Sequence, residues 1–276
     1  PDANPEGHIA LCVAENMLVQ ELFARRLMQP GTAITAFSDS IVYSYGGFLG
    51  LPSAREAFAY FLAHRFLLAT TTDRGHNKSS IIPSLEYDQQ VQDHQSSQTV
   101  NPAHVALGSG ANSLLSHLFF TLAEKEDAVL IPAPYYTAFE NDMKVVAGCV
   151  PFPVHSTNPV EGPTLDDLEA AAKSAEKKGL HVKILLLTNP NTPLGVYYRP
   201  PVVRDAILWA RNRGMHTIVD ELYALSVHQT NHEFQSVIQI LNNQLNEDVH
   251  MIWALSKDFG ACGFRVGVLY TQNDLL

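Results

Sequence analysis

The stretch that decides the fold is VKILLLT, from Val182 to Thr188, an almost unbroken apolar run. A strand that is apolar on both faces is typical of a parallel sheet covered by helices on each side. Outward from this run, apolar segments of strand length alternate with segments of helix length. Strands are expected at 104–107, 128–131, 149–154, 215–219, 249–255 and 265–270, and helices at 16–29, 53–66, 111–123, 135–147, 165–178 and 201–213. This alternation predicts an α/β fold with a mixed, mostly parallel sheet flanked by helices.

The composition excludes several classes of protein. The net charge of the 276 residues is −10, which argues against general nucleic-acid binding because that requires a basic surface. No apolar run reaches the length of a membrane span, and the first residues lack the pattern of a signal peptide, so we expect no membrane partner. Cys12, Cys149 and Cys262 are too few for a disulfide framework, which favours a reducing compartment such as the cytoplasm.

Two segments depart from the strand–helix alternation. Residues 70–102 are rich in Thr, Ser, Gln, Asp and His, which predicts a polar linker on the surface. The sequence ends with Thr271–Leu276, directly after an expected core strand and without a closing helix. We therefore expect that a C-terminal part of the fold is missing from this chain.

Chemically useful residues follow the expected strands. In an open α/β sheet, ligands bind beyond the carboxyl ends of the strands, so these residues should converge at one edge. They are Ala111 and Asn112 after a glycine-rich turn, Tyr136 in PAPYY, Thr192 in NPNTPLG, Asp220 and Tyr223 in DELY, and Lys257 and Arg265 in the last connection. Such a set fits pyridoxal 5'-phosphate, which needs a lysine for its aldehyde and a carboxylate for its pyridine nitrogen. Its phosphate binds to helix N–H groups and an arginine, and its ring lies against an aromatic face.

Five motifs, in order, resemble the class I/II aminotransferase family, and most of all its 1-aminocyclopropane-1-carboxylate (ACC) synthase-like branch. They are VAEN at 13–16, PAPYY at 132–136, TNPNTPLG at 188–195, DELY at 220–223 and SKDFGACGFRVG at 256–267. The resemblance spans residues 4 to 276 and implies the large domain of a fold-type-I pyridoxal-phosphate-dependent transferase. By this resemblance, residues 1–69 form an N-terminal arm and part of a small domain, and residues 103–276 form the cofactor-binding large domain.

The resemblance also implies a role for each matching residue. Lys257 would bind the cofactor aldehyde and move the Cα proton, Asp220 would pair with the pyridine nitrogen, and Tyr223 would bond to the ring hydroxyl. Arg265, Ala111 and Asn112 would bind the phosphate, Tyr136 would stack on the ring, and Thr192 would lie near the ring hydroxyl. Glu15 and Phe48 would lie on the substrate side of the site.

Four positions depart from the family pattern. Thr192 stands in place of the family's Asn, Ala254 in place of a phosphate-binding Ser, Phe48 in place of a Tyr that reaches the partner subunit, and Asn112 in place of a Thr. Each lost hydrogen bond is worth roughly 0.5–1.5 kcal/mol, so we expect weakened cofactor binding. Phe48 argues against the cyclising ACC synthase reaction. The family arginine that binds the substrate carboxylate is expected beyond Leu276.

Simpler interpretations of the same residues remain open. Lys257 could be a surface lysine, Asp220 and Glu15 could cap helices, and Tyr136 could be a core aromatic residue. The Gly108-x-Gly110 turn imitates a dinucleotide-binding fingerprint, but Ser113 stands at the third glycine position and no ribose-binding acid ends the next strand. No metal site is expected, because His228 and His232 have helical spacing without the Glu of a zinc protease motif.

Taken together, the residues and the resemblance predict an enzyme that acts at Cα of an amino acid through an external aldimine. An aminotransferase is the leading prediction. A pyridoxal-phosphate-dependent lyase, catalysing ACC-forming γ-elimination or C–S cleavage, is one alternative. A truncated or degenerate family member without activity is another. The family's dimeric habit predicts a homodimer that binds a small amino-acid substrate.

Overall fold

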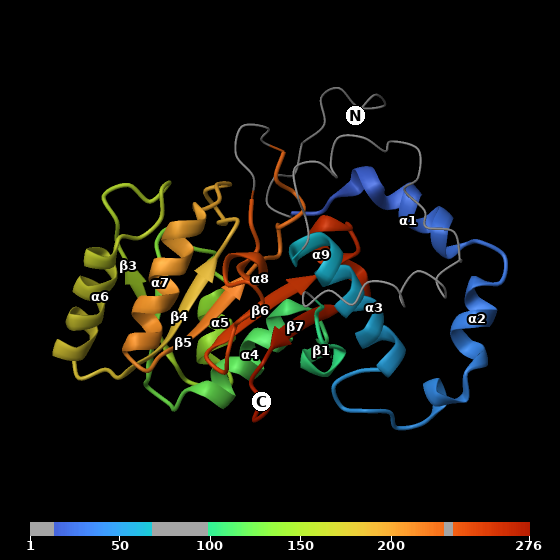
Figure 1. Cartoon of the computed structure of the whole chain (residues 1–276), viewed down its shortest axis with the longest axis horizontal. Coiled ribbons are helices and arrows are strands. Elements are labelled where there is room, and N and C mark those ends of the chain that lie inside the picture. The colour runs from blue at the N-terminus through green and yellow to red at the C-terminus, as the bar shows by residue number, and fades with distance from the viewer. Residues whose placement is uncertain (1–13, 68–98, 229–233) are drawn as a thin grey trace.

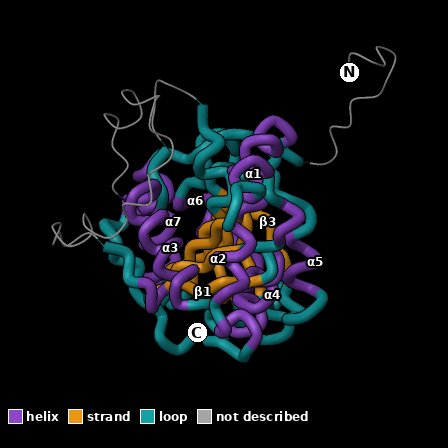
Figure 2. Tube along the Cα trace, turned by 90° about the vertical axis from the view of Figure 1, so that its right-hand side faces the viewer, coloured by secondary structure: helices purple, strands orange, loops and turns teal. Residues whose placement is uncertain are grey.

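The computed structural model describes residues 14–67, 99–228 and 234–276. Most of the predicted polar linker, from 70 to 98, and His232 lie outside the described residues. The elements around the sheet form three layers, with helices on both faces of the strands (Figure 1, Figure 2). The predicted α/β architecture is therefore confirmed.

One seven-stranded sheet forms the centre of the molecule, in the order β1-β7-β6-β5-β4-β2-β3. Strands β2 to β6 run parallel to one another, whereas β7 runs antiparallel to both β6 and β1. The strands are β1 Val105–Gly108, β2 Ala128–Pro132, β3 Val150–Val154, β4 Val182–Thr188, β5 His216–Asp220, β6 Val249–Ala254 and β7 Gly267–Thr271. The sheet is thus mixed and mostly parallel, as predicted.

Alternating side chains of the strands face two different helix layers. Ile184, Leu186 and Ile218 pack with α4 (Ala111–Leu122) and α5 (Phe139–Lys144). Their neighbours in sequence, such as Leu185 and Leu187, pack with the opposite layer. That layer consists of α3 Pro52–Leu62, α6 Leu165–Lys177, α7 Pro200–Asn212 and α8 Val237–Ile240. Burial on both faces explains why the strand VKILLLT has no polar side (Figure 2).

Local sequence sets where the covering helices begin. Thr164 and Asp167 form a capping box, in which each side chain accepts a hydrogen bond from the other's backbone N–H, at 3.1 and 2.9 Å. Pro200 occupies the first turn of α7, where a missing N–H costs nothing. Gly110 precedes α4 with φ +81°, a conformation that residues with a Cβ rarely adopt.

The arm before α3 lies beside the layered body. It contains a 3-10 helix, Met17–Val19, followed by α1 (Gln20–Leu27) and α2 (Thr32–Ser38), and none of these three elements has a buried residue. Figure 1 shows α1 and α2 at the side of the molecule beyond α3. None of the helices in the part of the chain that the structure describes is long and apolar enough to cross a membrane.

Several predicted element bounds differ from the structure, and the helix expected at 16–29 is a 3-10 helix followed by α1, which ends at Leu27. Three differences have a clear local cause. The helix expected at 135–147 covers only Phe139–Lys144, because the stretch that follows Pro134 is a turn. The strand expected at 249–255 ends at Ala254, and Leu255 begins the short helix α9 (Leu255–Asp258). The strand expected from Arg265 starts at Gly267, because Arg265 has a left-handed conformation with φ +54°.

Candidate active site

The carboxyl ends of the parallel strands bring the predicted residues to one edge of the sheet. In the strand register, Asp220 of β5 lies beside Thr188 of β4 on one side and Ile252 of β6 on the other. Helix α9, which carries Lys257, begins directly after β6. The sequence-based expectation that these chain segments converge is therefore met for Asp220 and the lysine helix.

Asp220 is a buried carboxyl at the centre of this edge, with only 4% of its surface exposed. Burial raises the pKa of Asp220 to about 7, against an ordinary value of 3.8, and the charge of nearby Asp142 adds to this effect. The backbone N–H of Leu222 donates a 3.1 Å hydrogen bond to Oδ1, which offsets only part of the shift. A cationic ligand group placed against Asp220 would therefore restore its charged form.

Two buried polar atoms at the end of β4 have no hydrogen-bond partner among the described residues. They are Thr188 Oγ1 and Asn189 Nδ2, in side chains that are 5% and 1% exposed. Unsatisfied buried polar atoms are costly and rare, so each calls for a partner. Their position beside Asp220 suits an edge of the sheet that binds a polar ligand. On this observation, the residues present fit pyridoxal phosphate.

The start of α4 and Arg265 form a second part of the site. The N–H groups in the first turn of a helix have no acceptor within the helix, and here they belong to Ala111 and Asn112. A Cβ at Gly110 would overlap the guanidinium of Arg265, so this cation lies against the start of the helix. Helix N–H groups beside an arginine are well suited to bind a phosphate.

The side chain of Asn112 points to a carboxylate. Its Nδ2 donates to both oxygens of Asp142, at 3.0 and 3.3 Å. Burial raises the pKa of Asp142, and the bond from Asn112 partly offsets this. Asn112 therefore ties the first turn of α4 to α5, and its backbone rather than its side chain is available for a phosphate.

Lys257 is held by the N-terminal arm. Its Nζ donates a 2.9 Å hydrogen bond to the carbonyl oxygen of Ala14. Next to it, the Cys262 thiol lies 3.7 Å from Glu15 Oε1, and a Cβ at Gly260 would collide with the carbonyl of Asn16. The structure thus brings Glu15 to the lysine loop, although Glu15 itself is exposed.

Tyr223 lies between several predicted site residues. Its hydroxyl shares a hydrogen bond with Thr192, and burial raises its pKa, helped by the charge of Asp220 and by Tyr136. Tyr136 is 46% exposed and packs edge-on against Phe139 at 5.4 Å between ring centres. One face of Tyr136 is therefore available at this edge.

Phe48 is the predicted residue that the structure does not bring into contact with the others. It is 99% exposed, in a segment whose neighbour Leu49 accepts a hydrogen bond from Leu107 of β1. Within one chain, Phe48 therefore contributes no contact to the edge described above.

The sequence reasoning missed five residues that shape the site: Asp142, Thr188, Asn189, Glu221 and Asp258. Four of them stand next to a predicted residue or within a motif. The polar side chains of motifs at strand ends could therefore have indicated these four positions from the sequence. Glu221 is fully buried and accepts bonds of 2.6 Å from Ser236 Oγ and from the N–H of Val237. Burial raises its pKa to about 8, and its two accepted hydrogen bonds anchor the start of α8.

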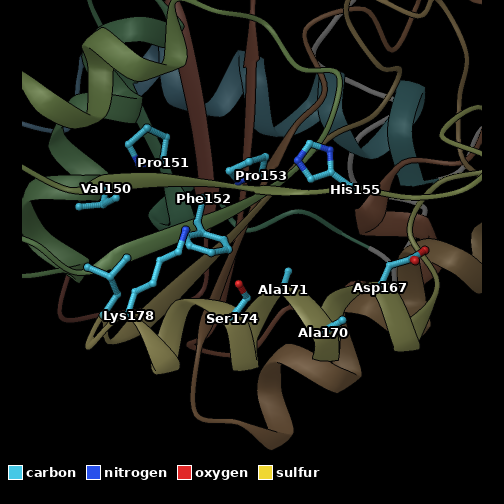
Figure 3. Close-up of a pocket in the computed structure, with 11 residues that line it drawn as sticks. Val150, Pro151, Phe152, Pro153, His155, Asp167, Ala170, Ala171, Ser174 and Lys178 are labelled. Atoms are coloured by element: carbon cyan, nitrogen blue, oxygen red, sulfur yellow. The ribbon is translucent and has the colours of Figure 1, made fainter.

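A hollow of about 510 Å³ lies away from this edge, between β3 and α6 (Figure 3). Lys178 reaches over the ring of Phe152, with 5.0 Å from Nζ to the ring centre. Pro151 and Pro153 lie along the same strand, which is an edge of the sheet where prolines block further strand pairing. None of the predicted site residues lines this hollow.

Comparison with known proteins places these features in a family. A model of the family "Aminotransferase class I and II" matches residues 42–276. The "probable inactive 1-aminocyclopropane-1-carboxylate synthase-like protein 2" of Mus musculus is 32% identical, and the aligned region covers 99% of this chain and 43% of that protein. The 1-aminocyclopropane-1-carboxylate synthase of Nicotiana tabacum is 30% identical, with 99% and 52% covered. The chain thus spans about half the length of the curated relatives it matches.

Solved structures show the same fold. An archaeal alanine:glyoxylate aminotransferase matches with a TM-score of 0.72 at 18% identity, covering 99% of this chain and 58% of that one. The aspartate aminotransferase of Thermus thermophilus with maleate matches with a TM-score of 0.63 at 20% identity, covering 96% and 55%. Together with the family match, these likenesses confirm the predicted α/β fold class, which the solved aminotransferases share.

Proposed function

Because the chain belongs to the class I and II aminotransferase family, we propose that it binds pyridoxal phosphate and acts at Cα of an amino acid, with transamination as the leading reaction. One observation carries the proposal. Asp220, a buried carboxyl with a pKa raised to about 7, lies at an edge shared with the helix of Lys257 and two unsatisfied polar atoms. This arrangement supports a site for a flat, cationic and polar group.

When bound, pyridoxal phosphate supplies an electron sink that stabilises negative charge at Cα of an amino acid. Asp220 would hold the proton on the ring nitrogen, because a cation against this buried carboxyl favours its charged form. Lys257 Nζ would bind the aldehyde and then carry the proton at Cα, a task suited to an amine held in place by its surroundings. To do so, Nζ must leave the carbonyl of Ala14.

Other residues would anchor the ends of the ligand. Arg265 and the N–H groups of Ala111 and Asn112 would hold the phosphate. Tyr223, supported by Thr192, would bond to the ring hydroxyl, and Tyr136 would cover the ring face.

The substrate side involves the arm and a second subunit. Glu15, beside the lysine loop, would face the substrate amino group. Phe48, exposed in one chain, would approach the site of the partner in a homodimer. The large domain would be residues 103–276 and the arm with part of a small domain residues 1–69. The free thiols of Cys149 and Cys262 are consistent with a cytoplasmic protein.

A second candidate function is cofactor binding without turnover. Ala254 sits at the start of α9 with no side-chain cap, and Thr192 is bonded to Tyr223, so two polar contacts that the family resemblance predicts are missing or altered. One relative bears the name "probable inactive", and another is an ACC synthase, which keeps the lyase reaction as a further alternative. An amino-acid test separates these outcomes.

The experiment loads the purified chain with pyridoxal phosphate and follows its visible absorbance as single amino acids are added. Transamination predicts a shift to the absorbance of pyridoxamine phosphate together with release of the matching keto acid. Lys257→Ala must abolish this change, whereas Lys177→Ala, an exposed lysine on α6, must not. Full activity of Lys257→Ala would overturn the proposal. A loaded chain whose absorbance responds to none of the amino acids tested would favour the second candidate.

A further inference from the structure

Asp258, the residue after Lys257, is the centre of a hydrogen-bonded clamp. Its Oδ2 accepts bonds from the N–H of Leu225 at 3.1 Å and from Trp253 Nε1 at 2.8 Å. Its Oδ1 accepts a 2.6 Å bond from Ser226 Oγ. The three donors come from two places, the end of β6 and the segment after β5, so one carboxylate joins both to the lysine helix.

The segment held by Asp258 is the turn that carries Tyr223. The N–H of Ala224 donates to the carbonyl of Glu221, and the N–H of Ser226 donates to that of Tyr223, both at 3.0 Å. One end of this turn continues from β5, and its other end, at 225–226, is fixed by Asp258. The backbone of Tyr223 is therefore held from both sides.

The third donor anchors the clamp to the core. Trp253 is fully buried and contacts four phenylalanine rings, at centre-to-centre distances of 4.9 to 6.4 Å: Phe58, Phe61, Phe66 and Phe259. A ring packed on this many sides cannot swing away, so its Nε1 fixes the position of the carboxylate. Burial raises the pKa of Asp258, and the hydrogen bonds from Ser226, Trp253 and Leu225 oppose part of this shift.

We propose that Asp258 is a positioning residue that holds the hydroxyl of Tyr223 in register with the amine of Lys257, so that both reach one bound ring. The inference rests on the proposed function, because it assigns Asp258 a task in that same site. The three hydrogen bonds of Asp258 all come from protein donors, so Asp258 acts through the turn of Tyr223 and through the direction of α9.

The first test uses the cofactor-free chain and measures hydrogen–deuterium exchange of residues 221–226. Asp258→Ala removes the acceptor of the Leu225 amide and releases the Ser226 side chain that fixes the end of the turn. Exchange of the Leu225 amide, and of the Ser226 amide within the loosened turn, should therefore speed by about tenfold, with the strands β4 and β5 unchanged. Unchanged exchange in the turn would overturn the proposal.

Milder variants guard against general unfolding. Ser226→Ala removes only the donor to Oδ1 and should speed exchange less than Asp258→Ala. Trp253→Phe removes the indole donor together with part of a buried ring, and it should also speed exchange of the turn. The matched control is Trp209→Phe, since Trp209 on α7 donates from its Nε1 to Glu169 Oε2 at 3.1 Å and makes no hydrogen bond to Asp258. This control must leave exchange of 221–226 unchanged, and an equal effect of both tryptophan variants would contradict the clamp.

The Asp258→Asn variant separates the effect of the side chain's position from the effect of its charge. In Asp258→Asn, the amide oxygen can accept from Leu225 and Trp253 while its NH2 donates to Ser226 Oγ, because a hydroxyl both donates and accepts. Positioning predicts that Asp258→Asn keeps most of the wild-type exchange protection. Exchange as fast as in Asp258→Ala would show that charge, and not position, is what matters.

The second test uses the chain loaded with pyridoxal phosphate and measures the apparent pKa of its visible absorbance band. Tyr223→Phe should shift this pKa, and Asp258→Ala should shift it in the same direction. The double variant should shift little further than Tyr223→Phe alone, because both changes remove one interaction. Fully additive shifts would refute an action through Tyr223. If the chain binds no cofactor, the proposed function fails, while the exchange experiment still decides the clamp.

Discussion

Replacing the buried carboxyl at the centre of the site should stabilise the cofactor-free chain at neutral pH. Asp220 has a pKa of about 7 in the folded chain against an ordinary value of 3.8. The folded state therefore holds a proton that the unfolded state releases between these values, so stability falls as pH rises from about 4 to about 7. Because a tenfold change in proton affinity corresponds to about 1.4 kcal/mol, the cost above pH 7 reaches at most about 4 kcal/mol.

Asp220→Asn removes this cost and keeps the local geometry. The amide oxygen of asparagine can still accept the hydrogen bond from Leu222 N–H, now 3.1 Å long. Urea unfolding of both proteins at pH 5 and pH 8 measures the effect. We expect the variant to gain about 1–2 kcal/mol at pH 5 and up to about 4 kcal/mol at pH 8 relative to the wild type, because the unfolded carboxyl is already ionised at pH 5.

Binding of pyridoxal phosphate should respond in the opposite direction. A ring nitrogen that carries a proton loses its charge partner in Asp220→Asn, so affinity should fall by about tenfold or more. A stability difference that is the same at pH 5 and pH 8 would refute the burial argument. A variant that binds the cofactor as tightly as the wild type would refute the placement of the ring nitrogen at Asp220.

Three further predictions concern the helix start and the opposite end of the sheet. Arg265→Ala should weaken binding of pyridoxal phosphate by about tenfold but leave binding of phosphate-free pyridoxal unchanged. An equal loss of affinity for both ligands, measured by titration, would argue against a phosphate contact. Gly110→Ala should cost about 1–3 kcal/mol in urea unfolding, because φ is +81° and the new Cβ overlaps the Arg265 guanidinium; wild-type stability would contradict this. His250 has a pKa lowered to about 3 by burial and then by His216, so the folded chain loses stability as pH falls below about 6.5. His250→Asn should flatten that loss between pH 6 and pH 4, and an unchanged slope would show that other groups cause it.

The sheet was predictable because its strands are apolar on both faces. VKILLLT and AVLIP carry the pattern without interruption, and the structure places both in strands, β4 and β2. The direction of β7 could not be read in the same way, because an antiparallel strand has the same apolar composition as a parallel one. The predicted ends of helices and strands were wrong where a turn stands in place of the regular element, as after Pro134, where the helix begins only at Phe139.

The candidate site was predictable in its residue types and less so in its contacts. Asp220 ends β5 and Lys257 lies just after β6, so their placement at one edge follows from parallel strand order. The pairs Asn112–Asp142 and Leu225–Asp258 join residues 30 and 33 positions apart. No local pattern encodes such pairs, because they depend on how the elements pack. The roles assigned to all the predicted site residues stay predictions.

The most direct measurement reduces the chain loaded with pyridoxal phosphate with borohydride and locates the label by peptide mass mapping. We predict one stable modification, on Lys257, accompanied by a visible absorbance band before reduction that Lys257→Ala lacks. A chain that carries no label, or one whose label is spread over exposed lysines such as Lys177, would contradict the proposal that this edge of the sheet is a cofactor site.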